Sequence, residues 1–227
     1  MIASHTQEAY WGAFIMKRLL LIAIAAFAFL GTNAARAVPV DLELALLVDV
    51  SGSVDSGEYN LQKTGYVDAF NDPTIQNLIA GLPGGIAVTY IEWASTAATV
   101  VNWTQVTDAT SANAFATAIA NEPREPYTSV GSSTIPSNAI SYAYPLFGNN
   151  GFEGTRSVID VSGDGTGSST ATAAARAAAL ANGIDAINGL PIGSSTIEAF
   201  YQNYIVGGTG SFLIAANSFS DFQSAVY

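Results

Sequence analysis

The sequence has no cysteine and a single histidine, His5. Without cysteine, the chain forms no disulfide, no thiolate nucleophile and no zinc–thiolate site. His5 lies in a segment that we expect to be removed from the mature protein. A histidine base, a serine–histidine triad and a histidine-liganded metal are therefore all disfavoured. Oxygen-bearing side chains become the main candidates for a functional site.

Basic residues are also scarce. The chain has 7 Lys and Arg against 18 Asp and Glu, and its formal net charge is −11. Nucleic-acid phosphates require a basic stripe, so a nucleic-acid partner is disfavoured. Adsorption to anionic lipid is disfavoured for the same reason. An acidic, well-solvated surface of this kind is typical of an exported protein.

The N-terminal segment has the three parts of a secretory signal peptide. Met16-Lys17-Arg18 precedes an uncharged apolar run over residues 19–30, and an Ala-rich stretch ends at Ala37. We expect translation to start at Met16 and cleavage to follow Ala37, so residues 1–37 form an extension and leader. The alternative is an uncleaved anchor, but the apolar run is too short to span a bilayer comfortably. The mature chain is thus predicted to be exported to the periplasm, cell surface or medium, without a membrane span.

Residues 40–227 are predicted to form a single α/β domain. Strand-like apolar runs alternate with helical patterns, and residues 99–103 follow 86–93 closely enough to form a hairpin. This alternation predicts a doubly wound, Rossmann-like, mostly parallel sheet of about six strands, with one antiparallel edge strand and helices on both faces. The predicted strands are 42–48, 86–93, 99–103, 156–162, 184–189 and 211–215. The predicted helices are 56–71, 110–120, 135–147, 169–182, 196–204 and a short last one from 219.

Three separate segments place oxygen-bearing side chains where one cation could collect them. They are Asp49-Val50-Ser51-Gly52-Ser53, Thr134, and Asp164. The first and third follow strand-like runs, and the carboxyl ends of parallel strands meet at the edge of a sheet where ligands usually bind. Two carboxylates and three hydroxyls suit a small hard cation, Mg²⁺ first, with Mn²⁺ or Ca²⁺ as alternatives.

This arrangement resembles the metal-ion-dependent adhesion site of the von Willebrand factor type A (vWA) superfamily, over residues 40–227. The family usually has Thr-Asp-Gly at the third segment, whereas Gly163 precedes Asp164 here. The resemblance implies three direct hydroxyl ligands, two carboxylates that coordinate through water, and a vacant position for a partner's carboxylate. The hydroxyls are those of Ser51, Ser53 and Thr134, and the carboxylates those of Asp49 and Asp164.

The chain is more similar still to an exported bacterial branch of that superfamily, domain of unknown function 1194. The similar residues are Ile91-Glu92-Trp93-Ala94 and residues 187–192, 201–208 and 211–213. This closer resemblance implies the same fold and no particular activity.

Several alternatives stay open at this point. Asp-x-Ser-x-Ser alone also suits a helix N-cap, and a hydroxyl near Thr134 could replace it; the neighbours are Thr128, Ser129, Ser132 and Ser133. The glycine-rich segment 163–167 lacks the lysine of a phosphate loop. Asp160 and Glu92 are unusual inside strands, and Asp160 is expected either behind the site or paired with Arg156 or Arg176.

We therefore predict an exported, Mg²⁺-dependent binding module that captures an acidic group of a protein or peptide partner. It has no catalytic residues and is not an enzyme. One alternative is a phosphatase-like, metal-assisted hydrolase with Asp49 as nucleophile or ligand, disfavoured because no phosphate-binding Arg or Lys is near in sequence. Another is a structural surface protein whose metal only stiffens its loops.

Overall fold

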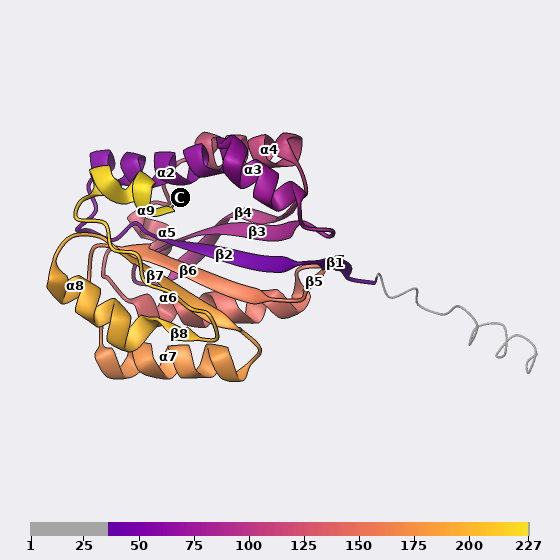
Figure 1. Cartoon of the computed structure of the whole chain (residues 1–227). Coiled ribbons are helices and arrows are strands. Elements are labelled where there is room, and N and C mark those ends of the chain that lie inside the picture. The colour runs from indigo at the N-terminus through magenta and orange to yellow at the C-terminus, as the bar shows by residue number, and fades with distance from the viewer. Residues whose placement is uncertain (1–35, 227) are drawn as a thin grey trace, which may run out of the picture. The chain divides into compact units, whose positions relative to one another are not determined.

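The computed structural model describes residues 36–226 (Figure 1). The predicted signal peptide lies almost wholly outside this range. No helix in the described range is long and apolar enough to cross a membrane.

The centre of the fold is a six-stranded sheet with the order β4-β3-β2-β6-β7-β8. Its inner strands are parallel, and both outer pairs are antiparallel. This confirms the predicted fold class and adds a two-residue edge strand that was not predicted. The strands are β2 (Leu42–Asp49), β3 (Ile86–Trp93), β4 (Ala97–Val106), β6 (Ser157–Gly163), β7 (Ala186–Pro191) and β8 (Gly207–Gly208). Two further strands, β1 (Val38–Val40) and β5 (Phe152–Gly154), pair separately.

Helices cover both faces of the sheet (Figure 1). On one face lie α2 (Ser56–Asn71), α3 (Pro73–Ala80), α4 (Ala109–Asn121) and α9 (Phe222–Val226); on the other lie α6 (Pro136–Ala143), α7 (Ser169–Ala181) and α8 (Ser195–Phe200). Shorter elements are α5 (Tyr127–Val130), the 3₁₀ turns 144–149 and 219–221, and a π-helical turn, Tyr201–Ile205.

Alternation along β2 divides the core into two clusters. Leu46 and Val48 pack under α2 and α4, whereas Ala45 and Leu47 face α6 and α7. Successive strand side chains point to opposite faces, so Asp49 at the end of β2 follows Ala45 and Leu47. The Asp49 side chain therefore points toward the face of the sheet that carries α6, α7 and α8.

Local sequence explains most helix boundaries. Asp55 caps α2 by accepting bonds from Gly57 N (2.7 Å) and Glu58 N (2.9 Å). Asp72-Pro73 ends α2 as predicted, but it also starts α3: the Asp72 carboxylate accepts from Thr74 N at 2.7 Å, and proline suits a first helical turn. No helix is predicted at residues 73–80 from the sequence, so α3 is an element that the sequence analysis missed.

Two predicted elements differ in the structure. The predicted strand 211–215 is wrong, because this segment makes only isolated bridges to β7 and the amide of Phe212 donates to the Asn188 side chain (3.1 Å) instead of to a strand. The predicted helix 135–147 stops at Ala143 and continues as a 3₁₀ turn. Pro145 follows directly and has no N–H to donate to the helix.

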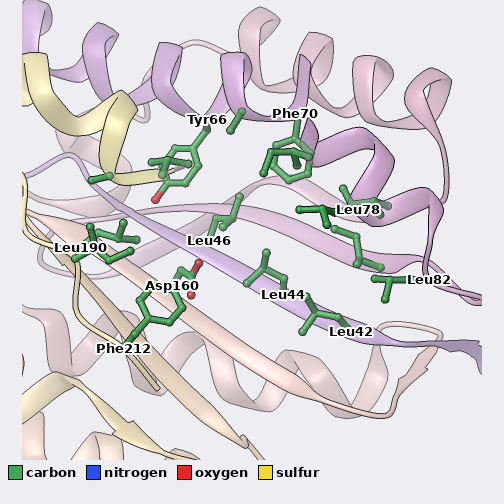
Figure 2. Close-up of a pocket in the computed structure, with 17 residues that line it drawn as sticks. Leu42, Leu44, Leu46, Tyr66, Phe70, Leu78, Leu82, Asp160, Leu190 and Phe212 are labelled. Carbon is green, nitrogen blue, oxygen red and sulfur yellow. The ribbon is translucent and has the colours of Figure 1, made fainter. Parts of the chain in front are cut away.

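An apolar groove of about 450 Å³ lies between α2, α3 and the sheet. Figure 2 shows Leu42, Leu44 and Leu46 of β2 along its floor, with Asp160 as a carboxylate among them. Asp160 accepts a hydrogen bond from Asn188 Nδ2 at 2.7 Å. Neither predicted arginine pairing forms, because both guanidiniums donate to backbone carbonyls; Arg156 contacts Thr209, and Arg176 contacts Asn203 and Val206.

Candidate metal site

The five residues predicted as ligands come together at one edge of the sheet. The register of β2 against β6 sets Val48 beside Ser162, so the loops after both strands begin at the same level. Hydrogen bonds then connect the hydroxyl and carboxylate groups in a chain. Thr134 Oγ1 donates to Ser51 Oγ (3.0 Å), Ser51 Oγ lies 3.2 Å from Ser53 Oγ, and Ser53 Oγ donates to Asp164 Oδ1 (2.7 Å).

Asp49 lies at the bottom of this group and is fully buried. Its Oδ1 atom accepts from the amide of Ser51 at 2.8 Å, while Oδ2 has no hydrogen-bond partner among the described residues. Burial is the largest cause that raises the pKa of Asp49 to about 7; the nearby carboxylate of Asp164 adds to it, and the Ser51 hydrogen bonds oppose it. A cation at this point would supply the missing partner and favour the ionised carboxylate.

The chemistry of the donor set suits a hard divalent cation. Carboxylate and hydroxyl oxygens are the ligands that such cations prefer. The hydroxyl separations, 3.0 Å from Thr134 to Ser51 and 3.2 Å from Ser51 to Ser53, are hydrogen-bond distances and place the three hydroxyls close enough to contact one ion. The donor set and the unpartnered Asp49 oxygen therefore fit a hard divalent cation such as Mg²⁺.

The composition of the site distinguishes it from an all-carboxylate or histidine site. Residues 36–226 contain no group of three or more His, Asp or Glu side chains placed to hold a metal. Neutral hydroxyls would leave a bound cation electrophilic, able to attract an external acid. Ser53 is exposed and Asp164 half-buried, so the site opens to solvent on that side.

Thr134 is placed by loop contacts that the sequence alone did not define. Gly131 turns the chain with a φ of 75°, and the amide of Ser133 donates to Ser95 Oγ at 2.9 Å. A Cβ atom at Gly165 would lie 2.8 Å from Thr134 Cγ2, so glycine is required there for close approach. Of the hydroxyls near residue 134, that of Thr134 itself contacts Ser51.

Sequence reasoning missed Arg124, which holds residues 50–54 in place; this segment is called the metal loop because it carries two of the predicted ligands, Ser51 and Ser53. Its Nη2 atom donates to the carbonyls of Val50 (2.7 Å), Ser51 (3.1 Å) and Val54 (2.9 Å). The guanidinium also lies 5.4 Å and 5.5 Å from the ring centroids of Tyr59 and Tyr127, within cation–π range. No local pattern indicates this role, because 70 or more residues separate Arg124 from the loop.

Glu92 joins the same support. It is fully buried at the end of β3, where its carboxylate accepts from Tyr59 Oη at 2.8 Å and from the amide of Glu125 at 2.6 Å. Burial raises the pKa of Glu92, whereas these two hydrogen bonds lower it. Gln62 on α2 also contacts the site, donating to the Asp49 carbonyl at 3.1 Å. Through its hydrogen bond to the amide of Glu125, Glu92 holds the segment around Glu125 next to the metal loop.

Solved structures with the same fold include a matrix protein and a pilus adhesin. Proximal thread matrix protein 1 of the mussel byssus, in a structure with a zinc-occupied MIDAS motif, aligns with a TM-score of 0.59 at 17% identity, covering 82% of this chain and 45% of that protein. The pilus adhesin SpaC of Lactobacillus rhamnosus GG gives 0.58 at 18%, covering 82% and 30%. BatB of Bacteroides thetaiotaomicron gives 0.54 at 19%, covering 82% and 95%.

These identities establish the shared vWA-like fold alone. The chain spans less than half the length of the mussel protein and of the adhesin. No curated protein sequence matches the chain. Residues 39–227 match the family described as "Protein of unknown function (DUF1194)", which is the branch expected from the sequence.

Proposed function

From the premise that this chain belongs to the DUF1194 family of vWA-like proteins, we propose that it is an exported, Mg²⁺-dependent protein-interaction module. Its coarser role as an interaction module is supported by structural neighbours that include an adhesin and a matrix protein. The proposal adds the ion, the acidic partner group and the location.

One observation carries the proposal. Five side chains from three separate segments form one hydrogen-bonded group beneath an opening to solvent, and the deepest oxygen, Asp49 Oδ2, lacks a partner. Buried polar atoms are nearly always satisfied, so an unpartnered carboxylate oxygen beside a group of hydroxyls supports an ion, or a water molecule bound to it, as one partner of Asp49.

Each residue has a distinct part in this proposal. When bound, Mg²⁺ would act as a Lewis acid that attracts a carboxylate from the partner. Three hydroxyls would hold the ion without neutralising it, and two carboxylates would balance its charge from behind. The hydroxyls belong to Ser51, Ser53 and Thr134, and the carboxylates to Asp49 and Asp164.

Catalysis is not part of the proposal. A phosphatase-like enzyme would need a cationic group free to bind the phosphate. The guanidinium of Arg124, next to the site, already donates to three backbone carbonyls of the metal loop. Mg²⁺-dependent turnover in a broad screen of phosphate and ester substrates would reverse this conclusion.

Calorimetric titration of the purified protein with Mg²⁺ tests the proposal. Wild-type protein should bind one ion, and Asp49→Ala should abolish binding. Glu153→Ala provides a matched control, because Glu153 is an exposed carboxylate on β5, away from the loops that form the site. Equal Mg²⁺ binding by all three proteins, or none by the wild type, would refute the ion site.

Thermal unfolding with and without the ion gives an independent measurement. An ion at 100 times its Kd should raise the free energy of unfolding by about 2.7 kcal/mol. A chelator should remove this gain in wild-type protein and have no effect on Asp49→Ala. Ion-dependent stability with no retention of acidic peptides on the immobilised protein would favour the structural role instead.

A further inference from the structure

Two buried polar atoms without partners lie close together behind the candidate ion site. One is Asp49 Oδ2 and the other is Tyr201 Oη, and neither has a hydrogen bond within the described part of the chain. A Cβ atom built on Gly163 would lie 2.6 Å from Asp49 Oδ2 and 2.8 Å from Tyr201 Oη. Both oxygens therefore border the same small space beside Gly163, and one water molecule could bridge them.

The ring of Tyr201 packs on the face of the sheet, against Gly189 of β7. The side chain is fully buried, and a Cβ atom at Gly189 would lie 3.1 Å from its Cδ1 atom. Gly189 stands opposite Val161 in the β6–β7 register, two residues before Gly163. Two glycines on neighbouring strands thus leave the room in which the tyrosine reaches Asp49.

The backbone at Tyr201 is unusual as well. It begins the π-helical turn Tyr201–Ile205, directly after α8. Such turns occur often at functional sites. The Tyr201 carbonyl accepts from the amide of Val206 at 2.9 Å, which closes the turn and fixes where the ring enters the core.

We propose that Tyr201 is a positioning residue of the ion site: in the ion-bound protein its hydroxyl donates to Asp49 Oδ2, directly or through one water molecule, and so orients the carboxylate that faces the ion. This inference rests on the proposed function, because it concerns the ion-bound site. It assigns a role to a side chain outside the five predicted ligands.

The chemistry of the hydroxyl supports this role. Burial, and then the nearby carboxylates of Asp49 and Asp164, hold the pKa of Tyr201 well above its ordinary value. The hydroxyl therefore keeps its proton and can donate it. One hydrogen bond between the two oxygens would satisfy two buried groups that otherwise lack a partner.

The same geometry explains the unusual Gly163 before Asp164. Any side chain at this position would bring its Cβ atom within 3 Å of both Asp49 and the tyrosine hydroxyl. Glycine is therefore the residue that permits Tyr201 to approach the carboxylate. The buried tyrosine gives a reason why Gly163 stands where the family usually has threonine.

Tyr201→Phe tests the inference, with Tyr90→Phe as a matched control. Tyr90 is also fully buried with an unpartnered hydroxyl, but it packs in the other core cluster, under α2. In ion-free protein, both variants should keep or slightly raise the melting temperature, because each removes an unsatisfied polar group. In calorimetric titration, Tyr201→Phe should weaken Mg²⁺ binding about tenfold, as loss of a group that supports a ligand commonly does, whereas Tyr90→Phe should not change it.

The outcomes separate this inference from the proposed function. If wild-type protein binds no Mg²⁺, the proposed function fails and the inference fails with it. If wild-type protein binds Mg²⁺ and Tyr201→Phe binds it equally well, only the role of Tyr201 is refuted. Failure of ion-free Tyr201→Phe to fold would also refute it, since the hydroxyl would then have a structural partner without the ion.

Discussion

At the residue scale, the candidate ion site depends on which hydroxyl faces Ser51. The segment from 128 to 134 contains five hydroxyl side chains, and sequence spacing does not distinguish them. In the fold, Thr134 Oγ1 donates to Ser51 Oγ at 3.0 Å, while Ser133 is exposed. Position in the loop, not residue type, therefore decides which hydroxyl contacts Ser51.

Thr134→Ala should weaken Mg²⁺ binding by about tenfold or more, because it removes one of the three proposed direct ligands. Its effect on the ion-free melting temperature should be small, since one partly buried hydrogen bond contributes about 1 kcal/mol. Calorimetric titration and thermal unfolding measure the two effects. Ser133→Ala is the control and should change neither; equal effects of both substitutions would show that Thr134 has no special role.

At the element scale, the metal loop is held from outside by a segment distant in sequence. Arg124 binds three carbonyls of residues 50–54, and Glu92 on β3 fastens the adjoining residue Glu125. Loops with few buried apolar contacts move easily unless they are tied down. These tethers pre-order the loop, so an ion would meet ligands already close to their bound positions.

Arg124→Met should destabilise the protein by about 2 kcal/mol, because hydrogen bonds from a charged donor to three carbonyls are lost. It should also lower Mg²⁺ affinity, since the loop must then be ordered by the ion. Denaturant unfolding and calorimetry test both effects. Arg156→Met is the control: its guanidinium donates to the carbonyl of Thr209, far from the metal loop, and Mg²⁺ affinity should be unchanged.

At the scale of the whole molecule, the two sheet faces are covered unequally. On the α2 side the apolar groove stays open, and its rim includes exposed Leu78, Phe212 and Ile214. Asp160 is the one carboxylate in its lining (Figure 2). Burial raises the pKa of Asp160 to about 6, and the hydrogen bond from Asn188 opposes this rise.

This raised pKa predicts a specific pH dependence. Between about pH 4 and pH 6 the folded protein binds more protons at Asp160 than the unfolded chain, so the free energy of unfolding falls as pH rises through this window. Asp160→Asn should remove that contribution and be more stable than wild type at pH 8, by about 1 kcal/mol, but not at pH 4. Denaturant unfolding at both pH values tests this, and a constant difference between the proteins would contradict it.

Much of the fold could be predicted because its signals are local. Alternating apolar runs, Asp55 at the start of α2 and Pro73 after it mark element ends within a few residues. Elements that depend on distant partners were missed or predicted wrongly. Strand β1 forms only by pairing with β5. The segment near Phe212 makes only an isolated bridge to β7, and its Phe212 amide donates to the Asn188 side chain instead of to a β7 carbonyl. Short strands carry too little pattern to be recognised alone.

The sequence by itself determined which ligand groups are available and in what order they occur along the chain. The lack of cysteine, the single early histidine and the motif at residues 49–53 limited the site to hydroxyls and carboxylates at the ends of parallel strands. Tertiary structure decided the rest: that Thr134 and not a neighbour meets Ser51, that Arg124 holds the loop, and that Tyr201 lies behind Asp49. The reason is physical, because residue type sets what a group can bind, whereas close approach of groups distant in sequence is set by packing of the whole chain.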